Sequence, residues 1–501
     1  MSRVTGAALI GVEGCVIEVE VRVSAQLPRV DIVGLPALSV RESGARVRAA
    51  IGSVGERFPQ NRVTVNLAPA ALRKNGAGLD LPIAIGVLLS SAAIEHASVQ
   101  GTAFLGELAL DGRIRPVAGA LAMALALKEH GIKKLILPSG CAHSAALAGE
   151  ELEVLPAEDL TQVLGHLRDI HPIPPTQANP IPESETPSPC LSEVRGQEFG
   201  KRALEIAAGG GHAALFLGPP GSGKTMLARR LPGILPPLES HERVEVTQIH
   251  CAAGVLAEDG QSVNDRPFRA PHHTSSAAGM LGGGQPPSPG EVSLAHGGVL
   301  LLDELPEFDR RTRESLRQVL EDHRVTLARA GLICQFPADF MLICTANPCP
   351  CGFYGCSHRD CRCDDGAIER YRRRLSGPLL DRIDLHVQVP AQRWSEWASA
   401  RTGEKSEAVQ QRVIQARRLQ LERSGASNAR ILDTTLDQIL DLSPEAESLL
   451  SQAVDRWGLS ARATRRIQRV ARTIADLAGE TVIGPADMGE ALAYRHDTQV
   501  P

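Results

Sequence analysis

The residues with the clearest chemistry lie in the sequence LFLGPPGSGKT, residues 215–225. An apolar run leads into glycines, and Lys224 and Thr225 complete the spacing G-x-x-x-x-G-K-T of a phosphate-binding loop. Glycines let backbone N–H groups turn toward phosphate oxygens, and the next helix presents its positive dipole end. We expect Lys224 to bind the β- and γ-phosphates of ATP and Thr225 to bind Mg²⁺; the alternative is a chance glycine-rich turn. The predicted nucleotide-binding residues here are Gly218, Pro219, Pro220, Gly221, Ser222, Gly223, Lys224, Thr225 and Met226.

A second motif, GVLLLDE at residues 298–304, pairs an apolar run with two acids. The run predicts a buried parallel strand, and open sheets of this kind bind ligands at the carboxyl ends of their strands. We expect Asp303 to hold Mg²⁺ through water and Glu304 to orient and polarise the water that attacks ATP. The alternative is a buried strand that ends in a solvated turn.

A third strand is predicted in FMLICTAN, residues 340–347. Asn347 at its end matches the sensor-1 position of AAA+ proteins, where a polar group contacts the γ-phosphate or the attacking water. A strand-terminal asparagine on its own is more often a turn former. Its place after the two nucleotide motifs favours the sensor.

Five of the eleven cysteines fall between residues 349 and 363. Two C-x-C pairs in that stretch can bring four thiolates around one tetrahedral Zn²⁺, and no open coordination position is implied. The expected ligands are Cys349, Cys351, Cys361 and Cys363, with Cys356 or His358 in reserve. The alternatives are reduced thiols in a loop and an iron–sulfur cluster.

Arginines near the end of the ATPase region are candidates for charge stabilisation. In ring ATPases, an arginine at the place of Arg382 projects into the neighbouring subunit's nucleotide site and stabilises the γ-phosphate in the transition state. Arg374 is the reserve candidate, and a plain Arg–Asp surface pair is the alternative. Arg462, at the start of a helix over 460–477, matches the sensor-2 arginine of AAA+ lids that reaches the nucleotide. The other arginines of that helix are expected to be solvated or intersubunit.

Two inserts between the ATPase strands carry polar residues. The first is RPFRAPHHTSS, residues 266–276, and the second is a predicted hairpin over 321–336 that turns near residues 330–331. In helicase-like AAA+ proteins such inserts line a central pore. The candidate DNA contacts are therefore Arg269, His272, His273 and Arg329. The alternative is a set of solvated or interface residues.

Residues 1–170 predict an α/β domain, with strands over 15–23 and 62–67 and helices over 39–54 and 79–91. The runs GELALDGRIRPVAGALAMALALKEHGIKKLILP and KNGAGLDLPIA resemble the Lon-protease-like domain. A working Lon protease has a Ser–Lys dyad, whose members would fall near Ala77 and Leu121, and neither residue can supply a nucleophile or base. We expect an inactive protease fold in which Lys74 and Asp80 are structural or face DNA. An intact protease with displaced residues is the alternative.

Composition sets the wider frame. A chain of 501 residues is too long for one core and predicts about three domains. The net charge of −5 gives no global nucleic-acid footprint, so any DNA contact must be local. We find neither a membrane-spanning run nor a secretion signal and expect a cytoplasmic protein. The predicted divisions are an inactive Lon-like domain (1–170), a proline-rich linker (171–190), an ATPase core with a parallel sheet (191–390) and a helical lid (391–501).

Together these motifs resemble the magnesium-chelatase-like AAA+ proteins, and within them the ComM/YifB family. The run NPCPCG, residues 347–352, begins at the sensor asparagine and is specific to the resemblance. The resemblance implies a homo-hexameric, ATP- and Mg²⁺-dependent helicase that drives branch migration of single-stranded or branched DNA in natural transformation. The rivals are a chelatase motor subunit, which would act on a porphyrin, a protein-remodelling ATPase, a protease and a non-enzymatic scaffold. We expect no porphyrin partner.

Overall fold

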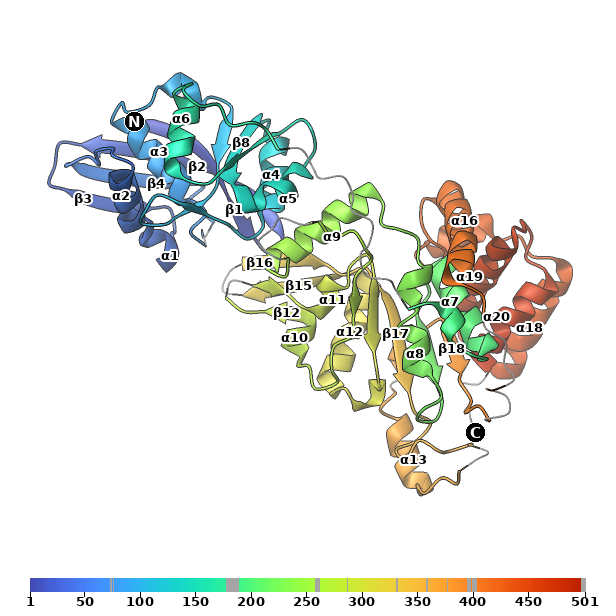
Figure 1. Cartoon of the computed structure of the whole chain (residues 1–501). Coiled ribbons are helices and arrows are strands. Elements are labelled where there is room, and N and C mark those ends of the chain that lie inside the picture. The colour runs from blue at the N-terminus through green and yellow to red at the C-terminus, as the bar shows by residue number, and fades with distance from the viewer. Residues whose placement is uncertain are drawn as a thin grey trace.

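The computed structural model places an N-terminal α/β domain beside an ATPase core, with a helical domain on the core's far side (Figure 1). It describes residues 1–176 except 73 and 75, and then 189–256, 262–285, 287–329, 332–356, 359–375, 377–393, 398 and 403–496. Most of the predicted linker therefore lies outside the described residues. Among the described helices, none is both long and apolar enough to cross a bilayer.

The N-terminal domain is built on a seven-stranded mixed sheet in the order β3-β4-β2-β1-β5-β8-β9. Its strands are β1 (Ser2–Ile10), β2 (Glu13–Ser24), β3 (Arg29–Val33), β4 (Arg62–Ala68), β5 (Thr102–Phe104), β8 (Lys134–Pro138) and β9 (Glu153–Ala157). The first hairpin is long and antiparallel, and the last three strands run parallel. Side chains of β4 alternate between buried and half-buried, which is the pattern of a strand with one face on a core.

Helices cover this sheet as the sequence indicated. They are α1 (Leu38–Arg41), α2 (Ser43–Ser53), α3 (Asp80–Ser90), α4 (Ala120–Glu129), α5 (Ala142–Ala146) and α6 (Leu160–Leu167). The single helix predicted over 39–54 is wrong in detail, because a turn at Glu42 divides it into α1 and α2. A short antiparallel hairpin, β6 (Glu107–Leu108) with β7 (Ile114–Arg115), follows β5.

The ATPase core holds a five-stranded, wholly parallel sheet in the order β11-β14-β17-β10-β18. Its strands are β10 (Ala214–Leu217), β11 (Phe268–Arg269), β14 (Val299–Leu302), β17 (Met341–Ala346) and β18 (Leu385–Gln388). All residues of β14 and β17 are buried, because helices pack on both faces of the sheet. The carboxyl ends of β10, β14 and β17 therefore meet at one edge, where the phosphate loop starts and where Asp303, Glu304 and Asn347 lie.

The helices of the core are α7 (Glu198–Gly210), α8 (Lys224–Ala228), α9 (Ser240–Ala252), α10 (Ala277–Leu281), α11 (Glu291–Leu294), α12 (Arg310–Asp322), α13 (Asp365–Arg372) and α14 (Gly377–Leu380). Two short hairpins accompany them, namely β12 (Gly282–Gly283) with β13 (Ser288–Pro289), and β15 (Arg324–Arg329) with β16 (Leu332–Pro337). The second is the hairpin predicted over 321–336; its turn, residues 330–331, lies outside the described part of the chain.

Within the described residues, the C-terminal domain contains five helices: α16 (Ser406–Ser424), α17 (Asp433–Ile439), α18 (Pro444–Trp457), α19 (Ala461–Ala478) and α20 (Pro485–His496). An apolar stripe of α19 is buried, with Ile467, Val470 and Ile474 in a core shared with the ATPase sheet. This helical domain is therefore packed against α7 and β18 rather than joined only by the chain (Figure 1).

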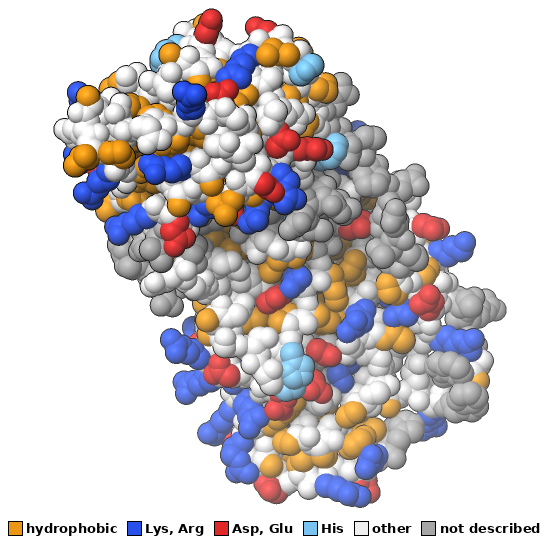
Figure 2. Space-filling model, turned by 60° about the vertical axis from the view of Figure 1, so that its left-hand side comes forward, with side chains coloured by type: hydrophobic (Ala, Val, Ile, Leu, Met, Phe, Trp, Pro, Cys, Tyr) orange, Lys and Arg blue, Asp and Glu red, His pale blue; other side chains and the backbone are white. Residues whose placement is uncertain are grey.

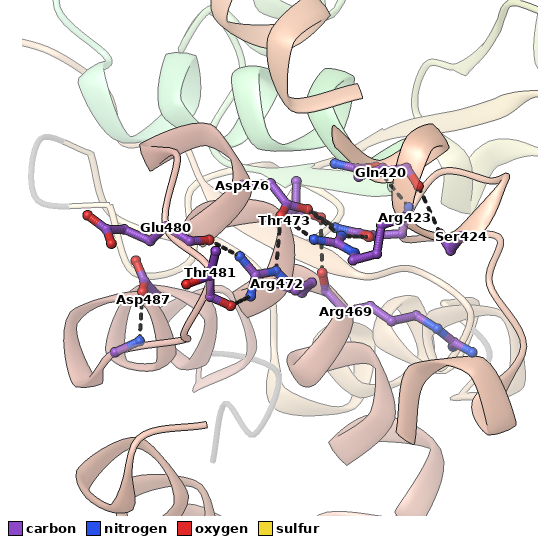
Figure 3. Close-up of polar contacts among 12 residues, drawn as sticks. Gln420, Arg423, Ser424, Arg469, Arg472, Thr473, Asp476, Glu480, Thr481 and Asp487 are labelled. Carbon is purple, nitrogen blue, oxygen red and sulfur yellow. Dashed lines mark hydrogen bonds and ion pairs between the residues drawn. The ribbon is translucent and has the colours of Figure 1, made fainter. Parts of the chain in front are cut away.

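The expectation that the other α19 arginines are solvated or intersubunit is wrong for Arg472. Its side chain is 1% exposed and donates to Asp476 at 3.0 Å and to the backbone oxygens of Thr481 and Glu480. Arg423 of α16 donates to both oxygens of the same Asp476, at 2.7 and 2.8 Å (Figure 3). A helical stripe identifies buried apolar residues, but it does not reveal that an acid one turn along makes an arginine part of the core.

The N-terminal domain contacts the ATPase core through the turn between β1 and β2. Val12 at this turn is 4% exposed and belongs to the apolar core that includes Phe336 of β16. Gln248 of α9 donates its Nε2 hydrogen to the backbone oxygen of Val12 at 2.7 Å. Gly11 has φ +65°, and an added Cβ there would lie 3.3 Å from the Cβ of Cys334 in β16. The Lon-like domain thus rests directly on the β15–β16 hairpin.

Candidate nucleotide site

The phosphate loop connects β10 to α8 at the carboxyl edge of the core sheet. Gly221 and Gly223 have φ values of +76° and +96°, which residues with a side chain rarely adopt. Gly218 is required for another reason, because an added Cβ would lie 2.1 Å from the backbone oxygen of Val389. The glycines predicted from the sequence therefore sit where this backbone path needs them.

Lys224 points back into the loop. Its Nζ donates to the backbone oxygens of Gly218 and Pro219, at 2.7 and 2.9 Å, and to Oδ1 of Asn347 at 3.0 Å. Burial lowers the pKa of Lys224, while the nearby Asp303 and Glu304 act in the opposite direction. The structure thus brings the predicted sensor asparagine and the loop lysine together.

Thr225 and Asp303 form the predicted Mg²⁺ pair. The Thr225 hydroxyl lies 2.9 and 3.1 Å from the two carboxylate oxygens of Asp303. Thr345, which sequence reasoning missed, donates its hydroxyl to Asp303 Oδ1 at 2.5 Å and accepts from the backbone N–H of Glu304 at 2.9 Å. Its signal in the sequence was its place two residues before Asn347, on the strand adjacent to β14.

Glu304 has a strained backbone. Its φ is +57°, in the left-handed region that glutamate seldom occupies, and such strain costs about 1–3 kcal/mol. The residue is exposed, and no described residue hydrogen-bonds to its carboxylate. That carboxylate is available to a ligand at the carboxyl edge of the sheet, as a water-orienting group must be.

Gln197 is a second residue whose detailed role the sequence did not indicate. Its side chain donates to the backbone oxygens of Ser222, at 3.1 Å, and Pro390, at 2.9 Å. This amide ties the phosphate loop to the end of β18.

The donor set fits a nucleoside triphosphate with Mg²⁺. The backbone N–H groups that open α8 have no acceptor within the helix, and the Ser222 hydroxyl is shielded from solvent without a described hydrogen-bond partner. An ammonium, a hydroxyl, two carboxylates and an amide converge on the same place. The arrangement is that of an AAA+ ATPase.

The four cysteines predicted to bind zinc do come together. Their sulfur atoms all lie within 4.8 Å of one another, and the Cys349, Cys351 and Cys361 sulfurs are separated by 3.4–3.6 Å. A tetrahedral Zn²⁺ with four bonds of about 2.3 Å places its sulfur ligands roughly 3.8 Å apart. The set fits zinc without Cys356, and the other reserve ligand, His358, lies outside the described residues.

This cysteine loop lies against the phosphate loop. Gly352, between the two C-x-C pairs, has φ +86°, and an added Cβ would lie 2.4 Å from Cδ of Pro220. The cluster therefore packs on the phosphate loop and begins two residues after Asn347.

Arg382 and Arg462 lie at the opposite, amino-terminal edge of the sheet. Arg382 precedes β18, whose first residue pairs with the first residue of β10. Both arginines donate to Glu321, near the end of α12, and Arg462 does so at 3.3 Å. Helix α12 starts near the nucleotide edge and has 13 residues, about 20 Å of helix. Arg462 therefore does not sit beside its own chain's phosphate loop, contrary to expectation.

A buried polar network holds the backbone around Arg382. Arg466 of α19 donates to the backbone oxygen of Arg382 at 2.9 Å and to Asp384 at 2.5 Å. Asp384 also lies 3.1 Å from His212, which in turn lies 2.8 Å from the hydroxyl of Thr473. Burial opposes ionisation of Asp384, but Arg466 and His212 bring its pKa below the ordinary value.

Arg374, the reserve candidate, pairs with Glu307 at 3.6 Å. Glu307 follows Glu304 closely, so Arg374 lies on the side of its own nucleotide edge. Arg374 and Arg382 therefore lie at opposite edges of the core sheet.

The candidate DNA contacts differ from one another. Arg269 donates to both oxygens of Glu291, at 2.7 and 2.8 Å, so its charge is already compensated within the chain. The rings of His272 and His273 are tilted by 34° with their centroids 4.1 Å apart, and His272 is exposed. The backbone of Arg329 ends β15, but its side chain lies outside the described part. On the face drawn in Figure 2, basic and acidic side chains are interspersed over most of the surface.

The N-terminal domain offers no Ser–Lys pair at the predicted places, since Leu121 is fully buried and residue 77 is alanine. Lys74 is buried and donates to the backbone oxygens of Gly34, at 3.0 Å, and Pro69. Asp80 is also buried and pairs with Arg46 at 2.6 Å. Both side chains are fully buried, which favours the structural alternative for these two residues.

A cavity of about 490 Å³ lies at the amino-terminal edge, between α16 and the starts of β14 and β17. Two arginines in its wall are paired with acids, Arg266 with Glu242 and Arg430 with Asp339. The phosphate loop lies at the other edge, so this cavity is separate from the nucleotide site.

Comparisons with known proteins agree with the geometry. The family model for magnesium chelatase, subunit ChlI, matches residues 190–397, and the model for its C-terminal part matches residues 403–495. The model for subunit ChlI of Mg-chelatase matches residues 19–140.

Similar proteins match along nearly the whole chain. Competence protein ComM of Haemophilus influenzae is 39% identical over 503 residues, 99% of this chain and 97% of ComM. YifB of Escherichia coli is 41% identical over 500 residues, 99% of this chain and 97% of YifB. Lon protease 2 of Bacillus subtilis is 30% identical over 162 residues, 30% of this chain and 29% of that protease. The chain belongs to the ComM/YifB family of magnesium-chelatase-like AAA+ proteins.

Proposed function

We propose that the protein is an ATP-dependent DNA motor, a helicase that acts as a homo-hexamer in homologous recombination during natural transformation. The observation that carries the ATPase part is the meeting of Lys224, Thr225, Asp303 and Asn347 at one sheet edge. The DNA part is supported by the name of a relative that matches the chain almost end to end, a competence protein.

In this proposal the chain's own residues bind and align ATP. The phosphate loop wraps the phosphates, Lys224 binds the β- and γ-phosphate oxygens, and Asn347 helps to position the γ-phosphate. Glu304 orients the attacking water and accepts its proton. Thr225 and Asp303 would hold Mg²⁺, which supplies charge neutralisation to the phosphates when bound.

The placement of Arg382 and Arg462 supports a ring. Both guanidiniums lie at the sheet edge remote from their own phosphate loop, where a neighbouring chain's nucleotide would sit in a head-to-tail arrangement. Arg382, and with it Arg462, would then stabilise charge on the neighbour's γ-phosphate. A closed ring of identical chains would satisfy every site in this way.

We assign DNA contact to the β15–β16 hairpin, with Arg329, and to the segment that carries His272 and His273. The hairpin begins directly after α12, whose other end follows Glu304 along the chain. A shift at the nucleotide edge would therefore reach the hairpin through one rigid helix. Arg269 is removed from this set because Glu291 compensates its charge.

We assign structural Zn²⁺ to Cys349, Cys351, Cys361 and Cys363. Four thiolates leave no open coordination position, so the metal would hold the loop against Pro220 rather than take part in chemistry.

The second candidate is a chelatase-type motor subunit or a protein-remodelling ATPase, which the names of the matching family models favour. Such a protein would hydrolyse ATP by the same residues but would ignore DNA. We expect no porphyrin partner.

The direct test is ATP-driven branch migration on a synthetic four-way DNA junction. We expect the wild-type chain to dissociate the junction by branch migration with ATP but not with a non-hydrolysable analogue. We expect Lys224→Ala to be inactive. ATP hydrolysis without any branch migration, unwinding or translocation would overturn the DNA-motor proposal and leave the second candidate.

A further inference from the structure

One carboxylate oxygen accepts hydrogen bonds from both arginines of the amino-terminal edge. The NH2 groups of Arg382 and Arg462 each donate to Oε1 of Glu321, and the Arg462 distance is 3.3 Å. The Arg382 side chain is 8% exposed, whereas those of Glu321 and Arg462 are about half exposed. Two arginines that are far apart in the chain thus converge on a single carboxylate oxygen of Glu321.

Two guanidiniums so close together repel each other unless an anion lies between them. A γ-phosphate oxygen can replace Oε1 of Glu321, because it is also an anionic acceptor at which two arginines can converge. The backbone of Arg382 is fixed by Arg466, and Arg462 lies in the first turn of α19. Neither element needs to move for the two side chains to exchange one anionic acceptor for another.

We propose that Glu321 is a positioning residue that takes the place of the neighbouring chain's γ-phosphate while that site is empty. It keeps Arg382 and Arg462 together at the amino-terminal edge and releases them when ATP binds across the interface. This inference rests on the proposed action of both arginines in trans, and it adds the residue that holds them and competes with the nucleotide.

A competitor of this kind weakens ATP binding without touching the chemical step. Removing its charge strengthens the arginine–phosphate contacts equally in the ground state and the transition state, which lowers KM and leaves kcat unchanged. We expect Glu321→Gln to lower KM for ATP by about three- to tenfold, the range of a partly exposed double ion pair. The turnover number should stay within about twofold.

The matched control is Glu314→Gln. Glu314 lies on the same helix, pairs with Arg317 at 2.6 Å and is exposed to a similar degree, but it does not contact either trans arginine. It should leave KM and kcat unchanged. Glu321→Asp keeps the charge on a side chain shorter by one methylene group, and we expect a KM between those of the wild type and Glu321→Gln.

Binding of a fluorescent ATP analogue extends the test to inactive chains. In an Arg382→Ala/Arg462→Ala background, Glu321→Gln should no longer tighten binding, because there are no arginines to release. An unchanged or raised KM in Glu321→Gln, or the same tightening in the arginine-free background, would overturn the proposal. All measurements are made without DNA, so failure of DNA stimulation would not affect them.

A mixing experiment separates this inference from its premise. Arg382→Ala and Lys224→Ala chains should each hydrolyse ATP poorly, and mixing them should restore activity at interfaces that join an intact loop to an intact arginine. No recovery would remove trans action and this inference with it. Recovery together with no Glu321→Gln effect would remove the inference alone.

Discussion

The ammonium group of Lys224 lies 3.0 Å from the side-chain oxygen of Asn347, although 123 residues separate the two in the chain. Parallel pairing of β10 with β17 creates this contact, because Leu217 aligns with Ala346 at the carboxyl end of each strand. The two groups that bind the γ-phosphate in our proposal are thus positioned by sheet register rather than by a flexible loop.

Thr345 should be important for Mg²⁺ although it makes no predicted contact with the ion. Thr345→Val keeps the shape of the buried side chain but removes the hydroxyl that donates to Asp303 at 2.5 Å and accepts from the Glu304 N–H at 2.9 Å. An unsatisfied buried group costs about 1–3 kcal/mol, so we expect roughly a tenfold rise in the Mg²⁺ concentration for half-maximal ATP hydrolysis. Thr345→Ser should behave like the wild type, and an unchanged Mg²⁺ requirement in Thr345→Val would contradict the assignment.

Replacing Cys361 and Cys363 with serine should remove bound zinc. The remaining thiolates cannot complete a tetrahedral site, and the loop that packs on Pro220 through Gly352 would lose its restraint. Elemental analysis should find about one zinc per wild-type chain and almost none in the double variant. Cys356→Ser is the control and should keep its zinc; wild-type protein without zinc would refute the site.

Val12→Asp should loosen the N-terminal domain from the ATPase core. The substitution places a charge in the apolar core beside Phe336, where the valine is 4% exposed, and should cost about 2–4 kcal/mol. We expect faster proteolysis between the domains and altered DNA stimulation, with basal ATP hydrolysis retained. Val33→Asp, at an exposed position of β3 in the same domain, is the control; equal proteolysis of both variants would contradict the specific contact.

His386 predicts how stability depends on pH. Burial, reinforced by Arg495, lowers the pKa of this histidine to about 3. In the unfolded chain its pKa is about 6.5, so the unfolded state takes up the proton first as the pH falls. The free energy of unfolding therefore does not depend on the protonation of His386 above about pH 6.5 and falls as the pH is lowered toward 3. The loss that His386 causes is about 2 kcal/mol at pH 5.

Denaturant unfolding at pH 7.5 and pH 5 measures this difference. His386→Leu should show a smaller loss of unfolding free energy between the two pH values, whereas replacing the exposed His130 should have no such effect. An identical pH dependence in wild type and His386→Leu would show that the buried histidine is not responsible.

The sequence predicted most of the nucleotide site because glycine spacing and strand-terminal acids are local signals. It also predicted the four-cysteine cluster, whose members lie close along the chain. Thr345 was missed because a threonine inside a buried strand carries no motif of its own. The positions of Arg462 and Arg472 could not be foreseen, because their partners, Glu321 and Asp476, are identified only once α12 and α19 are packed in space.

In the N-terminal domain, too, local features could be predicted from the sequence and tertiary contacts could not. Loss of the Ser–Lys dyad was visible at Ala77 and Leu121, but the burial of Lys74 and the contact of Val12 with β16 depend on tertiary packing. A turn of two strands that fits another domain's core has no periodic signal in the sequence.

The measurement closest to the central claim is ATP hydrolysis with and without single-stranded, duplex and forked DNA, made in parallel on Glu304→Gln. Our account predicts that DNA stimulates the wild-type chain and that the variant binds ATP but loses at least about 100-fold in turnover with every DNA. Robust wild-type hydrolysis that no DNA alters, or a Glu304→Gln chain that remains active, would contradict it.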